Sequence, residues 1–410
     1  MTVLVVGSGG REHALALAIS HDPGVAAVHI APGNPGTTAI GTNHPVDICD
    51  PDAVARLATE TGANLVVIGP EAPLVAGVAD AVRAAGIACF GPSAAAAQLE
   101  GSKAFAKQIM AEAGVPTAGH RVCHSQQELA AAFDEFGAPY VVKHDGLAAG
   151  KGVLVTNDRQ AALDHGAGAD QVVVEEYLDG PEASLFVITD GIHALALQPA
   201  QDFKRVGDGD AGPNTGGMGA YTPLPWLAPG TVDDVMASVV APTLARMREL
   251  GIPFAGLLYV GLAITSAGPK VVEFNARFGD PETEAVLPLL RSPLGQVLYA
   301  AATGTLAEIG PLDFDDRAAV CVVLAAQGYP ESPHKGGRIA LPADTDRVHV
   351  IHAGTALDET GQMVAAGGRV LVVVGTGSGL AEARAAVYDQ IAEIDFPTGF
   401  CRSDIASKVI

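Results

Sequence analysis

Cysteine, aromatic residues and positive charge are all scarce in this chain of 410 residues. It has five cysteines, its aromatic content is 5%, and 24 lysines and arginines stand against 46 aspartates and glutamates, for a formal net charge of −22. Such an acidic chain is a poor partner for DNA, RNA or an anionic membrane, although a local cluster of cations can still hold a small phosphate. No two cysteines form a CxxC pair, so we expect reduced thiols in a cytoplasmic protein.

Long apolar runs are also absent. No uninterrupted apolar stretch reaches the roughly 18 residues that a membrane-spanning helix needs. The chain enters a strand-like run, TVLVVG, without a basic segment or a cleavage site. We therefore expect no membrane partner. The composition is nevertheless 49% hydrophobic, which is enough for a large core, and the length predicts two to four domains.

Short apolar runs alternate with helical patterns over residues 1–101. The strand candidates are residues 3–7, 25–33, 65–70 and 88–93, and helical patterns cover residues 11–20 and 52–62. This alternation predicts a doubly wound parallel sheet in an N-terminal α/β domain. Ligands of such sheets lie at the carboxyl ends of the strands, where this chain has the turns GSGG, APGNPG, GPEAP and GPS.

Residues 102–300 follow a different pattern, which predicts a central α+β domain. A helix is expected over residues 101–114 with Ser102 as its N-cap. Strands are expected over residues 140–146, 152–156, 172–178 and 184–198, and a hairpin over 257–265 and 269–277. Residues 199–223 have neither a strand period nor a helix period, so we expect a long, ordered and functional loop there.

Residues 310–410 restart the strand pattern and predict a third, mostly β domain. Strands are expected over residues 318–330, 337–342, 348–354 and 368–377, followed by a helix over 380–394. The whole chain therefore predicts a multidomain fold of the α/β and α+β classes.

The glycine-rich stretch GLAAGKGV, residues 146–153, follows an expected strand. It departs from the Walker A pattern, because its spacing is one residue short and Gly152 stands where Ser or Thr would bind magnesium. Taken alone, it is compatible with a phosphate-binding loop or with a mobile turn. Lys143 just before it favours phosphate, and we expect nucleotide contacts from Gly150, Lys151 and Gly152.

Acidic residues end the strand expected over 172–178. Glu175 and Glu176 lie at this end, and Glu182 follows a turn. An adenine ring needs an apolar slot with backbone hydrogen bonds, and ribose hydroxyls favour a carboxylate. The segment is therefore a candidate nucleotide hinge, although solvated acids at an exposed strand end would give the same pattern.

The stretch VVEFNARFGDPE carries the sharpest chemical signal. Because side chains alternate along a strand, we expect Glu273, Asn275 and Arg277 on one face. A carboxylate and an amide oxygen two residues apart suit magnesium, whose coordination substrate phosphates and water would complete. Arg277 is placed to reach a phosphoryl oxygen. The alternative is an amphipathic strand with a solvated polar face.

The loop expected over residues 199–223 combines cations with the turn GPNTGG. Successive backbone N–H groups in a glycine-rich turn can form an anion-binding nest. We expect substrate contacts from this loop at Asp202, Lys204, Asn214, Gly216, Gly217 and Met218. The chain has no GxSxG motif, and Glu12 occupies the third glycine position of a dinucleotide-binding fingerprint.

These stretches together resemble the glycinamide ribonucleotide synthetases (phosphoribosylamine–glycine ligases), a family of ATP-grasp ligases of purine synthesis. The resemblance covers nearly the whole chain in order, from VLVVGSGGREHALA through GPEAPLVAG, FGPSAAAAQLEGSKAF and GLAAGKGV to QDFKRVGDGDAGPNTGGMGAY, EFNARFGDPETE and FCRSDI. GPNTGGMGAY and RFGDPE together are specific to this family. The resemblance implies an N-terminal domain, a central ATP-grasp domain whose mobile lid covers about residues 115–180, and a C-terminal domain.

The resemblance also implies roles for single residues. On the nucleotide side, it implies phosphate binding by Lys103 and Lys143, adenine binding by Glu175, Glu176 and Leu178, ribose binding by Glu182, and magnesium binding by Glu273 and Asn275. On the amine side, Gly9, Gly10 and Glu71 match the region where related ligases hold a phosphoribosyl substrate. Arg277 and Asp280 are our candidates for orienting glycine.

The chemistry implied is the ligation of glycine to 5-phosphoribosylamine with ATP and Mg²⁺, for which Mn²⁺ is a possible substitute. ATP would convert the glycine carboxylate into glycyl phosphate, which the amine then attacks, so no enzyme nucleophile is needed. Positioning and fixed charge from Lys103, Lys143 and Arg277 would supply the catalysis. Two alternatives stay open: an ATP-grasp ligase for another carboxylate and amine, and a nucleotide-binding protein without turnover.

Overall fold

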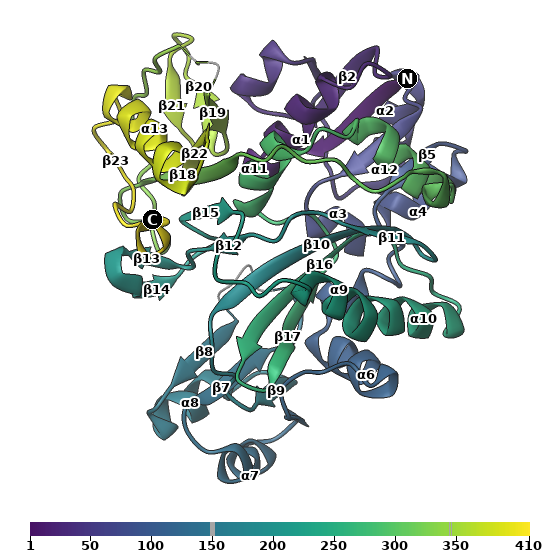
Figure 1. Ribbon diagram of the computed structural model, residues 1–410, viewed down its shortest axis with the longest axis vertical. Coiled ribbons are helices and arrows are strands. Elements are labelled where there is room, and N and C mark those ends of the chain that lie inside the picture. Colours follow the sequence, from purple (N-terminus) through teal and green to yellow (C-terminus); the bar gives the residue numbers. More distant parts are fainter. Residues whose placement is uncertain (148–151, 344, 346) are drawn as a thin grey trace.

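The computed structural model describes residues 1–147, 152–343, 345 and 347–410. These residues form one five-stranded, two four-stranded and one six-stranded sheet, with two two-stranded ribbons. The expected multidomain α/β and α+β fold is confirmed, because the N-terminal sheet is parallel and the three other large sheets are antiparallel. Figure 1 places the N-terminal and C-terminal regions beside each other at the top and the central region below them.

The N-terminal sheet has the strand order β3-β2-β1-β4-β5. Its strands are β1 (Thr2–Gly7), β2 (Ala27–Pro32), β3 (Thr42–Asn43), β4 (Leu65–Ile68) and β5 (Ala88–Phe90), and its helices are α1 (Gly10–Ser20), α2 (Pro51–Glu60), α3 (Glu71–Val75), α4 (Val78–Ala84) and α5 (Gln98–Gly101). All four residues of β4 are buried, as expected where helices cover both faces of a parallel sheet. The side-chain amide of Asn34 donates to the His352 carbonyl oxygen at 2.9 Å, which fastens this domain to the C-terminal region.

The central sheet is antiparallel in the order β11-β10-β16-β17. Its strands are β10 (Glu182–Asp190), β11 (Ala194–Ala196), β16 (Ala255–Thr265) and β17 (Gly268–Asn275). Helices α6 (Lys103–Ala113), α9 (Thr231–Val235), α10 (Ala241–Glu249) and α12 (Leu294–Thr303) pack around this sheet, whereas α11 (Glu282–Val286) packs against the C-terminal strands β15, β18 and β22. The expected hairpin is confirmed by β16 and β17. The expected N-cap is also confirmed, because the Ser102 hydroxyl accepts the Phe105 N–H.

A smaller sheet in the order β6-β9-β7-β8 lies at the lower end of Figure 1. It contains β6 (His120–Cys123), β7 (Tyr140–His144), β8 (Val153–Thr156) and β9 (Val172–Glu175), with α7 (Gln126–Phe136) and α8 (Arg159–Gly166). We call the described part of residues 120–175 the lid region. Its own buried cluster includes Leu129, Phe133 and Val142, so this region has a core separate from that of the central sheet.

The loop expected over residues 199–223 is ordered, but it is not a loop. It contains the short strands β12 (Gln201–Asp202), β13 (Arg205–Gly207), β14 (Ala211–Asn214) and β15 (Gly219–Thr222). Strand β15 pairs antiparallel with β18, from Gly219 opposite Val322 to Thr222 opposite Ala319. The prediction missed these strands because each is only two to four residues long, too short to show a period, and because β15 takes its place in the sheet from β18 about a hundred residues later.

The C-terminal sheet has the order β12-β15-β18-β22-β19, with β23 beside β18. Its remaining strands are β18 (Ala318–Ala326), β19 (Val348–His352), β22 (Arg369–Gly377) and β23 (Gly399–Phe400). The same region contains α13 (Leu380–Glu393) and the separate ribbon of β20 (Thr355–Leu357) and β21 (Met363–Ala365). The strand expected over residues 337–342 is wrong, because only isolated bridges at Arg338 and Ala340 occur there. Every residue of β18 is buried, so this strand runs through the centre of the sheet.

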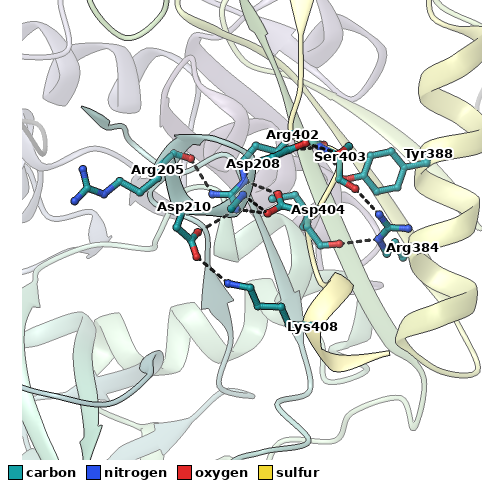
Figure 2. A network of polar contacts seen from close by, with 11 residues as sticks. Arg205, Asp208, Asp210, Arg384, Tyr388, Arg402, Ser403, Asp404 and Lys408 are labelled. Carbon is teal, nitrogen blue, oxygen red and sulfur yellow. Dashed lines mark hydrogen bonds and ion pairs between the residues drawn. The ribbon is translucent and has the colours of Figure 1, made fainter. Parts of the chain in front are cut away.

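A charged network fastens the end of the chain to the β13–β14 ribbon (Figure 2). The fully buried Arg402 donates to both oxygens of Asp404 at 2.7 and 2.8 Å, to Asp210 at 3.0 Å and to the Arg205 carbonyl oxygen at 3.0 Å. Lys408 binds the other oxygen of Asp210 at 3.0 Å. The ribbon is therefore held by residues roughly 200 positions away in the sequence.

The part of the chain described by the structure contains no helix that is long and apolar enough to cross a membrane.

Candidate active site

Helix α6 begins at the junction between the lid region and the central sheet. The carboxylate of Asp145, just after β7, accepts the Lys103 N–H at 2.6 Å and the Ser102 hydroxyl at 3.0 Å. An anionic cap of this kind is favourable at a helix N-terminus. The Lys103 ammonium then reaches the Gly146 carbonyl oxygen at 3.0 Å, so Lys103 lies at the start of the glycine-rich stretch.

Lys143 is buried on β7 and pairs with a buried carboxylate. Its ammonium lies 2.9 Å from Glu175 Oε1 and donates to the Val272 carbonyl oxygen at 3.1 Å. The other oxygen of Glu175 lies 3.0 Å from the ammonium of Lys107. Burial raises the pKa of Glu175, but the two lysines outweigh burial and hold it below its usual value. Glu175 is thus an ionised bridge between lysines, and its role in adenine binding stays a prediction.

Lys107 is the cation that the sequence patterns missed. Burial, together with the like charge of Lys143, lowers its pKa to about 8, although Glu175 opposes this shift. It follows Lys103 by one helical turn on α6, so the i, i+4 spacing was the available signal. The structure therefore places Lys107 and Lys143 on a single buried acid, with Lys103 close to Lys143. Two buried cations that share one acid leave positive charge available for an anionic ligand.

Glu273 and Asn275 lie at the end of β17, on the face opposite to the buried Phe274. Glu273 is close enough to Lys103 to raise its pKa, although burial and Lys143 lower that pKa overall. No cluster of three or more His, Cys, Asp or Glu side chains that could hold a metal occurs among the described residues. Two oxygen ligands on one strand still suit Mg²⁺, because phosphate and water usually complete its coordination.

Carboxylates gather opposite the lysines, around Asp202 on β12. Burial and the nearby Glu282, Glu182 and Glu273 raise the pKa of Asp202 to about 7, while Lys204 opposes this shift. Lys204 forms an ion pair with Glu182. Burial lowers the pKa of Lys204, but Asp202 and Glu182 outweigh burial and hold it well above its ordinary value. The structure therefore places the predicted substrate residues Asp202 and Lys204 beside the predicted ribose-binding residue Glu182.

Glu282 is a second residue that the patterns did not single out. Its carboxylate is buried and accepts hydrogen bonds from the Ser184 and Tyr259 hydroxyls, both at 3.0 Å. It follows the RFGDP turn directly, so the acidic continuation of that motif was the available signal.

Arg277 connects the central sheet to the N-terminal domain. Its guanidinium lies 3.3 Å from Glu71 and 3.1 Å from Glu100. Burial lowers its pKa, but the two carboxylates outweigh burial, so Arg277 stays charged. The predicted substrate residue Glu71 is therefore already paired with the predicted catalytic residue Arg277.

Asp280 lies where all three domains meet. Its Oδ1 is 3.0 Å from Nη1 of Arg369 on β22. A Cβ atom added to Gly9 would lie 3.7 Å from its Oδ2, so Asp280 also borders the loop before α1. Gly10, the first residue of α1, is buried. The structure thus brings Gly9, Gly10 and Asp280 to one place.

The expected anion nest at GPNTGG is wrong. The Gly216 N–H donates to the Tyr329 hydroxyl, the Gly217 N–H to the Thr215 hydroxyl and the Met218 N–H to the Phe203 carbonyl oxygen. These donors are already used within the protein. Asn214 pairs with Arg205 in the β13–β14 ribbon. Substrate contacts at these four positions stay a prediction, without the nest as their basis.

The other nucleotide-side predictions lie at the edges of this site. Gly150 and Lys151 lie outside the described residues, while the Gly152 carbonyl oxygen accepts from the His144 N–H at 2.8 Å. Glu176 is exposed, and its N–H donates to the Gly119 carbonyl oxygen. Leu178 is half-buried.

Comparison with known families accounts for this arrangement. Residues 1–100 match the N domain of phosphoribosylglycinamide synthetase, residues 101–283 match its ATP-grasp (A) domain, and residues 319–408 match its C domain. The chain belongs to the phosphoribosylglycinamide synthetase family. It is therefore an ATP-dependent carbon–nitrogen ligase of purine biosynthesis that acts on small molecules, as the resemblance implied.

Curated relatives and solved structures agree with this assignment. The chain is 58% identical to a phosphoribosylamine–glycine ligase of Streptomyces coelicolor over 100% of its own length and 99% of the relative's. It is 56% identical to the ligase of that name from Mycobacterium tuberculosis, covering 100% and 98%. The crystal structure of phosphoribosylamine–glycine ligase from Thermotoga maritima matches with a TM-score of 0.87 at 35% identity, covering 99% of this chain and 100% of that one.

The fold extends beyond this family. The biotin carboxylase domain of Hydrogenobacter thermophilus 2-oxoglutarate carboxylase, solved with MgADP and bicarbonate, matches with a TM-score of 0.74 at 15% identity, covering 97% of this chain and 91% of that one. At this identity the likeness shows a shared fold and nothing more about chemistry.

Proposed function

We propose that this ligase joins glycine to 5-phosphoribosylamine and converts ATP to ADP and phosphate. The observation that carries the proposal is the opposition of two charge groups between the lid region and the central sheet. The first group consists of the positively charged side chains of Lys103, Lys107 and Lys143. Glu273 faces them from β17, beside Asp202. A nucleotide triphosphate with its divalent cation needs both kinds of charge.

The first chemical step is the activation of glycine. A glycine carboxylate oxygen attacks the γ-phosphorus of ATP, the bond to the bridging oxygen breaks, and ADP leaves. Lys103 and Lys143 hold the phosphate oxygens and reduce their repulsion of the incoming carboxylate. A fixed charge of this kind, acting away from water, typically contributes about 3 to 4 kcal/mol to the transition state.

The site fits a divalent cation, and one protein of the same fold, the biotin carboxylase domain of Hydrogenobacter thermophilus 2-oxoglutarate carboxylase, has been solved with MgADP. Glu273 and Asn275 would hold Mg²⁺, with Mn²⁺ as a possible substitute. When bound, the ion would neutralise charge on the transferred phosphoryl group. Because no group of three or more His, Cys, Asp or Glu side chains suited to a metal occurs in the described part of the chain, we expect metal affinity to depend on the nucleotide.

The second step is amide formation. The amine of 5-phosphoribosylamine attacks the carbonyl carbon of glycyl phosphate, the C–O bond to phosphate breaks, and the amine loses a proton. Gly9, Gly10 and Glu71 are the proposed contacts for the phosphoribosyl group, while Arg277 and Asp280 orient glycine. Burial and the nearby Glu282 and Glu182 raise the pKa of Asp202 to about 7, so Asp202 is our candidate to receive the proton.

Isotope transfer tests this proposal directly. With glycine carrying ¹⁸O in its carboxylate, we expect one labelled oxygen to appear in the released phosphate, because phosphate leaves with the oxygen that it received from glycine. ADP release should require both glycine and 5-phosphoribosylamine. Release that depends on another amino acid would favour a different ligase, and binding of ATP without any turnover would favour a non-catalytic nucleotide-binding protein.

A further inference from the structure

Both polar backbone groups of Gly216 are held by the C-terminal domain. Its N–H donates to the Tyr329 hydroxyl at 3.0 Å. Its carbonyl oxygen accepts from Nη1 of Arg369 at 2.6 Å. Tyr329 follows β18 and Arg369 begins β22, whereas Gly216 belongs to the segment between β14 and β15. Two distant segments therefore fix a single residue of the predicted substrate region.

Arg369 also holds the neighbouring turn. The same Nη1 donates to the Asp280 carbonyl oxygen at 2.7 Å and lies 3.0 Å from Asp280 Oδ1. The Arg369 guanidinium packs against Gly216, where an added Cβ atom would lie 3.0 Å from Cζ. The next residue, Gly217, packs against the RFGDPE turn, because a Cβ atom added to Gly217 would lie 2.4 Å from Pro281 Cδ. Arg369 is therefore a clamp between GPNTGG and RFGDPE.

The contacts that hold Lys103 and Lys143 come from Asp145 and Gly146 after β7, from Glu175 on β9 and from Val272 on β17, and none of them involves β18 or β22. Asp280 instead borders Gly9 at the N-terminal loop. The charge of Arg369 is already balanced by Asp280, so its contacts suit a positioning role better than that of a free anion-binding site.

We propose that Arg369 and Tyr329 are positioning residues for amide formation, and that they fix Gly216 and Asp280 against the N-terminal loop where the amine substrate binds. This inference rests on the proposed function. Loss of the clamp lets the turn at Gly216 move relative to Asp280. A displacement of about 1 Å at a reacting centre can lower the rate about 10²-fold.

The test compares steady-state kinetics of the full-length protein and its variants. We expect Arg369→Met to lower kcat/KM for 5-phosphoribosylamine by about 10²-fold, while KM for ATP changes by less than twofold. Tyr329→Phe removes only the hydroxyl and should give a smaller loss of the same kind. The matched control is Arg347→Met, because Arg347 is an exposed arginine of the same domain that pairs with Glu382, and it should behave as the wild type.

A third variant keeps the proposal testable if Arg369→Met folds poorly. Gly216 does not have a positive φ, so Gly216→Ala is compatible with the backbone, while its methyl group displaces the guanidinium. We expect Gly216→Ala to reproduce the Arg369→Met phenotype. Because both changes break the same contact, the double variant should be no worse than the more impaired single variant.

The outcomes separate this inference from the proposed function. If the wild type shows no ADP release that depends on glycine and 5-phosphoribosylamine, both fail. If the wild type is active and the Arg369, Tyr329 and Gly216 variants match Arg347→Met, the inference alone is wrong. It is equally wrong if KM for ATP rises as much as KM for the amine, since that result indicates general loosening of the structure.

Discussion

The molecule contains two charge clusters that handle buried charge in opposite ways. In the C-terminal cluster, Arg402 is bound by Asp404 and Asp210, and Lys408 pairs with the remaining oxygen of Asp210. In the nucleotide-side cluster of Lys103, Lys107, Lys143 and Glu175, two of the lysines, Lys107 and Lys143, share the one buried acid Glu175.

The pKa values follow this difference. In the C-terminal cluster, hydrogen bonds from Arg402 lower the pKa of Asp404 to about 2. In the nucleotide-side cluster, burial and a neighbouring cation lower the pKa of Lys107 to about 8. In the C-terminal cluster the pKa shift favours the charged form of Asp404, whereas in the nucleotide-side cluster the pKa shift disfavours the charged form of Lys107. A surplus of one sign at a buried place costs stability, and we infer that a ligand of the opposite sign compensates for it.

The largest expected effect is at the metal-binding position opposite the lysines. Glu273→Ala should lower turnover by about 10³-fold or more, because the divalent cation loses its charged ligand. Thermal unfolding should change little, since the side chain is only half-buried. The control is Glu249→Ala, which removes an exposed acid on α10. A folded Glu273→Ala protein with normal Mg²⁺-dependent activity would falsify the metal assignment.

Removal of one lysine from the nucleotide-side cluster should have the next largest effect on activity. Lys143→Met should lower kcat/KM for ATP by about 10²- to 10³-fold, because one fixed cation is lost from a water-excluded site. Lys335→Met, at an exposed position of the C-terminal domain, is the control for loss of a lysine as such. If both variants retain the kinetics of the wild type, the nucleotide-side cluster does not bind phosphate.

Disruption of the C-terminal cluster should lower the free energy of unfolding and leave turnover nearly unchanged. Arg402→Met should destabilise the protein by about 2 to 3 kcal/mol, somewhat less than a fully buried pair would cost, because Asp210 is partly exposed. The turnover of the folded fraction should stay within about threefold of the wild type. Urea unfolding and kinetics measured on the same preparations would separate the two effects, and a large fall in kcat without destabilisation would contradict the comparison.

The same variant has a defined pH dependence. The pKa values of Asp404 and Asp210 are lowered in the folded protein, so their contribution to stability is present above the ordinary value of 3.8 and is lost as pH falls through the folded values. The wild type should therefore lose its advantage over Arg402→Met between about pH 4 and pH 2. An advantage that persists at pH 2 would show that the ion pairs do not cause it.

The smallest expected effect concerns Glu284 on α11, a buried acid that belongs to neither cluster. Neither carboxylate oxygen has a hydrogen-bond partner within the described part of the chain. Burial and the nearby Asp280 raise its pKa well above the ordinary value. The folded state therefore holds a proton that the unfolded state releases, and this contribution to stability is lost as pH rises.

Glu284→Gln should accordingly be within about 1 kcal/mol of the wild type at pH 5, since it imitates the protonated acid. At pH 8 the variant should be the more stable of the two. Thermal unfolding at both pH values gives the comparison, and a variant that is less stable at pH 8 would mean that Glu284 is ionised and paired.

Local patterns in the sequence predicted much of this protein, because the physical causes are themselves local. Alternation of strands and helices over residues 1–101 predicts a parallel sheet, and β1, β2, β4 and β5 form it. Ser102 predicts the start of α6, because a helix cap depends on the next three residues. The two-residue period of β17 likewise places Glu273 and Asn275 on one face, away from the buried Phe274.

Pairing between distant segments was decided only by the tertiary structure. Strand β15 pairs with β18 about a hundred residues later, and its four residues are too few to show a strand period. The N–H group of Gly216 donates to the Tyr329 hydroxyl, which lies 113 residues later and which local spacing could not foresee. Lys107 became visible as part of the site only when Glu175 was placed beside it. Sequence determines periods and caps over a few residues, whereas charge balance depends on which segments meet, and that requires the fold.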